Sequence, residues 1–339
     1  MKERKVLEYF IKTLNGMALG LFSTLIIGVI VRQIGDFTNI QVISQLAAVL
    51  MSLMGVGIGV GVAWSFKLTG LPLVAGAVAG GIATQVPLRA DPVIAYVTVI
   101  VAIEGVRFLL RKKTPFDIVL IPLVSSFLAL MTVLIIERPV LAMMDAISWY
   151  IDSATAYTPF FMGIIIAVLM GMALTAPISS AAIAVSITLG DPGSQASLIA
   201  GGAAVVGGAT QMIGFAVMSR KDNTMGAVLS VAFGTSMLHF KNILRKPIIW
   251  LPPILASAIL GPLSTVVFEM HTRYEGSGMG TSAFVGQFAT FDAMGYGVTT
   301  IFIVVLMHFV LPFLFVFIFD TIFRRKGWIV EGDFSLSET

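Results

Sequence analysis

The side chains best suited to bind a ligand gather in a glycine-rich stretch late in the chain. Residues 276–287 read Gly-Ser-Gly-Met-Gly-Thr-Ser-Ala-Phe-Val-Gly-Gln, apolar enough for a membrane but too rich in glycine for a stable helix throughout. We therefore expect a re-entrant segment at 275–290, entering from the outer side; a disordered outer loop is the alternative. Hydroxyl and amide groups there could hydrogen-bond a polyhydroxylated ligand. The candidate residues in and just before the stretch are Glu269, His271, Thr281, Ser282 and Gln287.

Three smaller clusters add further candidates. Thr84-Gln85 is echoed by Thr210-Gln211, at what we expect to be span ends. Pro177 removes a helix donor beside two serine hydroxyls, which predicts a break in the chain there. A third cluster, His239 and Asn242, lies on the expected cytoplasmic side. The candidate substrate-binding residues are Gln85, Gln211, Ser179, Ser180, His239 and Asn242.

Several kinds of chemistry are not supported. The sequence has no cysteine, which excludes a disulfide, a thiolate nucleophile and a thiolate metal site. Its three histidines are too scattered to indicate a metal centre, and we expect His308 to be a satisfied core residue. No Ser/His/Asp order, paired carboxylates or phosphate loop is seen. We therefore expect no catalytic site, metal or cofactor in the chain.

Composition defines the class of fold that must position these residues. Of 339 residues only 12% are charged and 57% are hydrophobic, with a mean hydropathy of +0.97. A soluble domain cannot bury that much apolar surface, and the long continuous apolar blocks do not alternate as barrel strands do. We expect an all-α polytopic membrane protein, 1–339 being one membrane domain. About ten spans are predicted, at 13–34, 42–64, 71–87, 92–110, 116–136, 159–189, 197–218, 224–240, 247–268 and 297–322.

The basic residues give the expected orientation. With ten spans and the N-terminus inside, 15 of the 21 Lys and Arg residues fall on the cytoplasmic side. This asymmetry predicts that both termini are cytoplasmic. The six residues predicted to lie outside are Arg32, Arg89, Arg138, Arg220, Lys221 and Arg273.

Three patterns bear on internal organisation. Segment 138–157 has its polar residues on one helical face, which predicts an amphipathic helix at the outer membrane surface, a water-exposed loop helix being the alternative. Similar text in the same order predicts a parallel repeat, 71–176 and 197–312, although glycine-rich membrane sequence can mimic one by chance. Alternating glycines at 55–61 indicate either close helix packing or unwound backbone beside a cavity.

Three motifs resemble a known family. Pro-Ile-Ser-Ser at 177–180, His-Phe-Lys-Asn-Ile-Leu-Arg-Lys-Pro at 239–247 and Gly-Met-Gly-Thr-Ser-Ala-Phe-Val-Gly-Gln at 278–287 are similar to the type-2 enzyme-IIC family of the sugar phosphotransferase system, which includes perfringolysin-O-regulator-like proteins. The resemblance covers essentially the whole chain. It implies a bacterial inner-membrane homodimer that holds a sugar between a scaffold and a mobile part, near re-entrant hairpins and a Glu/His pair.

The resemblance also implies partners and roles. A separate phospho-carrier protein of the IIA/IIB type would phosphorylate the sugar, so the chain would be at most the membrane subunit of the phosphotransferase. Glu269, His271, Thr281, Ser282 and Gln287 are the residues it implies for sugar binding.

We expect a transporter for a sugar or similar small polar solute, working by alternating access. A membrane sensor or regulator that binds a ligand without moving it is the main alternative, because the chain carries no attached carrier domain. An ion- or proton-coupled permease is a third.

Overall fold

The computed structural model describes residues 2–87, 90–110, 114–176 and 180–336. It is 82% helical, and no strand occurs within these ranges, which confirms the all-α membrane fold. By length and composition, six of the described helices could cross a membrane, or up to eight if each of two bent pairs is one span. Two shorter apolar helices, Leu71–Gln85 and Pro159–Thr175, add to these.

The chain divides into two compact units, Met1–Ala146 and Ile147–Thr339. The boundary falls inside the first predicted repeat, 71–176, and the repeat itself stays a prediction. The helices of unit 1 are α1 (Lys2–Leu21), η1 (Phe22–Ile26), α2 (Ile27–Thr38), α3 (Gln41–Ser52), α4 (Met54–Ser65), α5 (Leu71–Gln85), α6 (Pro92–Leu109) and most of α7 (Asp117–Tyr157).

The alternating glycines of α4 pack helices together. Gly57 and Gly61 touch the backbone of α1, whereas Gly55 and Gly59 touch that of α5. Residues two apart point to opposite sides of a helix, and those four apart to the same side. A side chain at any of the four positions would collide with a neighbouring backbone carbonyl. Close packing is therefore the role of these glycines.

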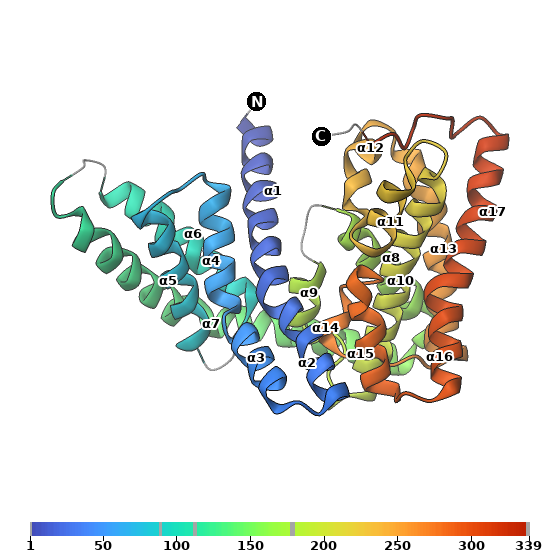
Figure 1. Cartoon of the computed structure of the whole chain (residues 1–339), viewed down its shortest axis with the longest axis horizontal. Coiled ribbons are helices and arrows are strands. Elements are labelled where there is room, and N and C mark those ends of the chain that lie inside the picture. The colour runs from blue at the N-terminus through green and yellow to red at the C-terminus, as the bar shows by residue number, and fades with distance from the viewer. Residues whose placement is uncertain (1, 88–89, 111–113, 177–179, 337–339) are drawn as a thin grey trace. The chain divides into compact units, whose positions relative to one another are not determined.

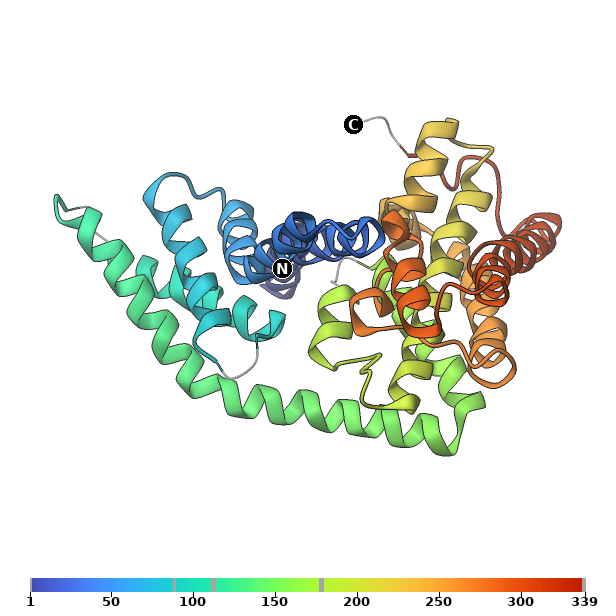
Figure 2. The same cartoon turned by 60° about the horizontal axis from the view of Figure 1, so that its bottom comes forward.

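Helix α7 runs without a break for 41 residues and carries the predicted segment 138–157 as its second half (Figure 2). In unit 2 the polar face of that segment turns toward protein: Ser148 hydrogen-bonds Thr188 at 3.2 Å, and Thr155 is buried. Trp149 and Tyr150 are exposed on the other side. A place at the membrane surface stays a prediction for this segment.

Unit 2 is built around α10, whose residues from Ala200 to Ser219 are all buried. Within unit 2, Figure 1 shows α10 among its partners α8, α11, α13 and α17. The helices of unit 2 are α8 (Pro159–Thr175), α9 (Ser180–Ser186), α10 (Gln195–Ser219), α11 (Met225–Phe233), η2 (Ser236–His239), α12 (Phe240–Arg245), η3 (Pro247–Trp250), α13 (Leu251–Pro262), η4 (Leu263–Val267), α14 (Tyr274–Ser277), η5 (Ser282–Phe284), α15 (Val285–Met294), α16 (Val298–Val305), η6 (Leu306–Val310) and α17 (Leu311–Arg325).

Hydrogen bonds define the two ends of unit 2. At one end the Leu198 carbonyl accepts from the backbone of Thr272. At the other the Met218 carbonyl accepts from Arg324. The 20 residues of α10 between these carbonyls span about 30 Å. We call the Met218 end the strap end, because residues 328–336 cross it as a C-terminal strap.

Segment 225–245, which joins α11 through η2 to α12, is a hairpin rather than a span. Its helices bend by 118° at residues 234–235. Asn223 before the bend and Asn242 after it both donate to carbonyls of the strap, those of Phe334 and Ser335. Both arms therefore lie at the strap end, so 224–240 does not run straight from one end of unit 2 to the other. We call this segment the 225–245 hairpin.

The predicted long span at 159–189 also returns to its starting end. The Pro159 carbonyl accepts from Thr265 at the end opposite the strap. After α8 and α9, the Gly190 carbonyl accepts from the backbone of Tyr274 at that same end. The segment is too long for one straight span, and its two ends lie at the same end of unit 2.

This path corrects the predicted sides of two basic residues. Arg220 and Lys221 lie at the strap end together with the bases that follow the 225–245 hairpin, not at the opposite end. Eight of the nine Lys and Arg residues of unit 2 then share one end: Arg220, Lys221, Lys241, Arg245, Lys246, Arg324, Arg325 and Lys326, the ninth being Arg273.

Candidate functional site

Three breaks in the helical backbone meet beside the middle of α10. The first is the turn of the 225–245 hairpin, where α11 stops at Gly234 and the Thr235 hydroxyl accepts from the Met237 backbone at 3.1 Å. The second is the stretch between α14 and α15. The third falls between the end of α8 at Thr175 and the start of α9 at Ser180, and is placed by these two flanking residues because 177–179 lie outside the described ranges. Because broken helices leave backbone groups unpaired, side chains from the neighbouring breaks must satisfy them.

The glycine-rich stretch supplies two such side chains. The Thr281 hydroxyl donates to the Ala232 carbonyl at 2.5 Å, and the Ser282 hydroxyl donates to the Gly234 carbonyl at 2.9 Å. Both residues are buried. The predicted re-entrant segment 275–290 thus meets the turn of the 225–245 hairpin inside unit 2, rather than forming an exposed loop.

Glycine lets this stretch approach its neighbours closely. Gly280 has φ +53°, in the left-handed region, and a Cβ there would lie 2.6 Å from the carbonyl carbon of Gly208 on α10. The Ser180 hydroxyl at the start of α9 donates to the Gly278 carbonyl at 2.6 Å. The stretch is therefore held against both α10 and the third break.

Gln211, a residue of α10, lies beside the end of α8. Its Oε1 accepts from Trp250 Nε1 at 3.0 Å and from the Thr175 hydroxyl at 3.3 Å. Since the indole can only donate, the bond fixes which end of the amide faces Trp250. Thr175 also pairs with the Ser236 hydroxyl at 2.8 Å, which ties α8 to the hairpin turn. Gln211 Nε2 is buried and has no hydrogen-bond partner within the described part of the chain.

Gln287 and His308 form a buried pair beside the glycine-rich stretch. Gln287 Nε2 donates to the Gly280 carbonyl at 3.3 Å, which fixes the orientation of the amide, and lies 3.0 Å from His308 Nδ1. Nδ1 must therefore accept, so the neutral ring carries its proton on Nε2. Among the residues described, neither Gln287 Oε1 nor His308 Nε2 has a hydrogen-bond partner.

We call these side chains the tip cluster. It combines five candidates from the sequence with others that sequence reasoning missed or set aside. His308 was expected to be a satisfied core residue, but one of its two ring nitrogens is not satisfied. Thr175, Ser236 and Trp250 carried no sequence signal beyond lying next to the noted motifs. The tip cluster is Thr175, Ser180, Gln211, Ser236, Trp250, Thr281, Ser282, Gln287 and His308.

His239 and Asn242 belong to a neighbouring arrangement. The His239 ring is fully buried and stacks on Phe215, with ring centroids 5.4 Å apart. Asn242 Nδ2 lies 3.4 Å from His239 Nδ1 and donates to the Ser335 carbonyl of the strap at 3.2 Å. These two residues connect the hairpin to the strap rather than to the tip cluster.

The structure does not bring Glu269 and His271 to the tip cluster. They lie beside Thr272, which bonds Leu198, whereas the tip cluster packs near Gly208, ten residues or about 15 Å further along α10. Glu269 is exposed with φ +42°. Burial lowers the pKa of His271, against a smaller opposing effect of the Glu269 charge.

The two remaining candidates do not join the cluster. Gln85 is an exposed residue of unit 1 that donates to the Ser52 carbonyl at 3.4 Å. Ser179 lies outside the described residues.

Long apolar helices around a buried polar cluster at helix breaks define a multi-pass membrane protein. Comparison with protein families makes the class specific. The family model described as Phosphotransferase system, EIIC matches residues 11–336, and the chain belongs to this family. No match was found among the curated proteins or the solved structures. Membership supports, in general terms, a sugar-transporting permease that works with IIA and IIB proteins.

Proposed function

We propose that this protein carries a neutral sugar, or a similar polyhydroxylated solute, across the membrane by alternating access, and that the tip cluster binds the solute. Family membership supports a sugar permease in general. The location of the site and the kind of solute are inferred from the geometry.

One observation carries the proposal. Three buried polar atoms of the tip cluster lack a hydrogen-bond partner within the described residues: Gln211 Nε2, Gln287 Oε1 and His308 Nε2. Each buried unpaired group costs about 1–3 kcal/mol. Two of these atoms are donors and one is an acceptor. A hydroxyl group both donates and accepts, so a polyol satisfies such a set.

The chemistry of the cluster favours a neutral solute. Its side chains are hydroxyls, amides, an indole and an imidazole that accepts at Nδ1 and is therefore uncharged. A buried charged solute would need an opposite charge beside it. Sugar hydroxyls require only neutral partners, and aromatic rings such as Trp250 suit their apolar faces.

The close packing of the tips requires movement for binding. Gly280 touches Gly208, and Ser282 bonds Gly234, so the 225–245 hairpin and the glycine-rich stretch are in direct contact. Separation of the hairpin from the stretch would open the cluster toward the strap end. Separation of the stretch from α9 would open it toward the other end. Alternating access follows if the two separations exclude each other.

The proposed orientation places the strap end in the cytoplasm, since it holds eight of the nine basic residues of unit 2. The C-terminal strap is then cytoplasmic, and a cytoplasmic N-terminus stays a prediction from the basic residues of the sequence. We further propose, from family membership, a homodimer in the bacterial cytoplasmic membrane, with phosphorylation by separate IIA and IIB carriers.

Binding of a panel of mono- and disaccharides to the purified protein tests the proposal. Gln211→Leu and Gln287→Leu should each weaken binding about tenfold or more, since each removes a hydrogen bond worth about 1.4 kcal/mol or more to the complex. Gln85→Leu, at an exposed glutamine of unit 1, is the matched control and should bind normally. A panel without a ligand, or equal effects of all three variants, would overturn the proposed site.

Flux into proteoliposomes separates transport from sensing. Uptake of the bound sugar supports a permease, and uptake that persists without any ion gradient excludes ion coupling. Binding without flux, in the presence of the carrier proteins, would favour the sensor.

A further inference from the structure

The C-terminal strap is tied to the 225–245 hairpin, whose turn contributes to the candidate site. Residues 328–336 leave α17 and run back across the strap end of unit 2 toward α12 (Figure 1). Ile329 and Phe334 of the strap are almost fully buried. A terminal segment with this much burial and hydrogen bonding is fixed to the domain rather than frayed.

The first arm of the 225–245 hairpin is held by two residues just before it. Asn223 Nδ2 donates to the Phe334 carbonyl at 2.8 Å, and Asn223 Oδ1 accepts from the Leu336 backbone at 2.8 Å. Asp222 accepts from the Phe334 backbone at 3.0 Å. Backbone N–H groups and a backbone carbonyl of the strap thus all bond to side chains at the start of this arm.

The second arm is held by α12 and the residue that follows it. Asn242 donates to the Ser335 carbonyl at 3.2 Å, and Lys246 Nζ lies 2.7 Å from Asp333 Oδ2. The same carboxylate oxygen accepts from the Val330 backbone at 2.8 Å. The strap therefore crosses both arms and joins one to the other.

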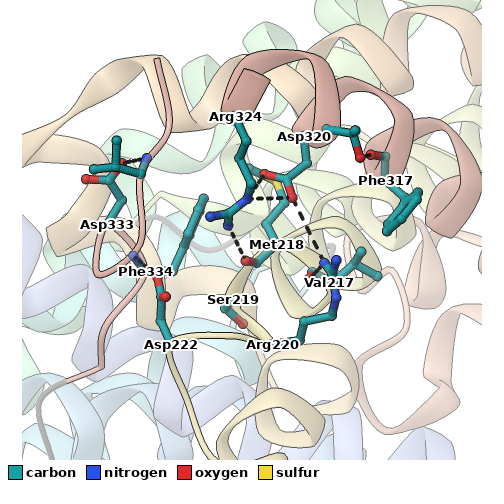
Figure 3. Close-up of polar contacts among 12 residues, drawn as sticks. Val217, Met218, Ser219, Arg220, Asp222, Phe317, Asp320, Arg324, Asp333 and Phe334 are labelled. Atoms are coloured by element: carbon teal, nitrogen blue, oxygen red, sulfur yellow. Dashed lines mark hydrogen bonds and ion pairs between the residues drawn. The ribbon is translucent and has the colours of Figure 1, made fainter. Parts of the chain in front are cut away.

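Phe334 anchors the strap on α10 and on the hairpin. Its ring packs against Phe215 of α10, at 6.3 Å between centroids, and against His239 of the hairpin at 5.8 Å. The Arg324 guanidinium lies 5.7 Å from the Phe334 ring centroid and is itself held by Asp320 and by the Met218 carbonyl (Figure 3). The strap thus links the hairpin to α10 and α17.

We propose that the C-terminal strap is a latch, which holds the 225–245 hairpin closed over the tip cluster and must release at least one arm before a solute reaches the strap end. The proposal rests on the proposed function, because the hairpin turn carries Ser236 of the tip cluster and Gly234, whose carbonyl accepts from Ser282. Its chemistry is one ion pair, four hydrogen bonds to the arms and one buried phenylalanine, which break together if the strap lifts.

The sequence makes a clean cross-linking test possible, since it has no cysteine. In a Lys246→Cys/Asp333→Cys variant the two thiols replace the ion pair, and a bifunctional methanethiosulfonate reagent joins them reversibly. We expect cross-linking to lower sugar flux about tenfold or more, as blocked opening of a gate does, while sugar affinity stays within about twofold. A reductant should restore flux. Each single-cysteine variant, treated with the same reagent, is the control.

A second measurement needs no solute. Hydrogen exchange of the full-length protein in detergent should show faster exchange across 225–245 in Phe334→Ala and in Asn223→Ala, with α10 unchanged. Asn223→Ala removes no core packing and serves if Phe334→Ala fails to fold. Unchanged exchange across the hairpin in Asn223→Ala, or full flux through the cross-linked protein, would overturn the latch. If no sugar binds at all, the proposed function fails, and exchange still decides whether the strap holds the hairpin.

Discussion

The amide of Gln287 donates to Nδ1 of His308 at 3.0 Å, deep inside unit 2. This one contact fixes the proton of the ring on Nε2, a buried donor that has no partner among the residues the structure describes. A buried polar pair of this kind can stabilise the fold, bind a ligand, or do both. Variants of the two residues distinguish these roles.

His308→Phe should lower both stability and sugar binding. Phenylalanine is somewhat larger than histidine and fills the position, but it removes the acceptor, so the Gln287 N–H loses a partner at a cost of about 1–3 kcal/mol. The double variant His308→Phe/Gln287→Leu removes both polar groups and should recover much of the stability, without recovering binding. Thermal unfolding in detergent and sugar binding are the two measurements. Recovery of both would show that the pair has only a structural role.

Gly280→Ala should be more destabilising than Gly327→Ala. Both glycines have positive φ, so alanine is strained at each by about 1 kcal/mol or more. Only at Gly280 would the new Cβ also meet a neighbour, the backbone of Gly208, whereas nothing lies within 4 Å at Gly327. We expect a fall of several degrees in the unfolding temperature of Gly280→Ala beyond that of the control. Equal effects would place Gly280 away from α10.

Asp320 and Arg324 should be strongly coupled. Asp320 is almost fully buried, and its carboxylate accepts from Arg324 Nε at 2.9 and 3.0 Å (Figure 3). Removal of Asp320 leaves the Arg324 guanidinium without its carboxylate, and removal of Arg324 leaves the buried Asp320 with only Arg220, 4.0 Å away. Each loss should cost about 3 kcal/mol. The variant Asp320→Leu/Arg324→Leu should therefore be less destabilised than either single replacement. Additive losses of stability would mean that the two charges act independently.

His271 should make the protein less stable in mild acid. Burial lowers its pKa in the folded state below the ordinary value of 6.5. Between these two pKa values the unfolded chain binds the proton and the folded chain does not, so stability falls as pH drops below about 6.5. His271→Asn should show a smaller loss of unfolding temperature between pH 8 and pH 5. An identical pH dependence in the variant would show that His271 does not contribute.

The class of fold could be predicted from the sequence. A chain with 57% hydrophobic residues in long continuous blocks belongs in a membrane, and such blocks satisfy their backbone hydrogen bonds there as helices. Which apolar segments cross could not. Segments 159–189 and 224–240 have the hydropathy of spans, yet both return to the end where they begin. Hydropathy indicates that a segment is buried in lipid or protein, but not which way the chain runs after a helix break. That direction is set by tertiary contacts such as the hydrogen bond from Asn223 to the Phe334 carbonyl.

The candidate site was predicted only in part. Thr281, Ser282 and Gln287 could be found because hydroxyls and an amide in a glycine-rich apolar stretch have few other uses. Gln85 and Gln211 sit in similar sequence, but the first is exposed and the second fully buried. Their difference depends on the helices packed around each one, which local sequence does not specify. Trp250 and His308 reach the site from distant segments and lack a local signal.

Helix α4 contacts α1 through one pair of glycines and α5 through another, on opposite sides. The register of the helix is therefore fixed twice. Insertion of a single residue at its middle would rotate one half relative to the other by about 100° and bring bulky side chains onto both neighbours at once. A helix of this kind tolerates exchange of its lipid-facing residues freely, but it does not tolerate a change in length.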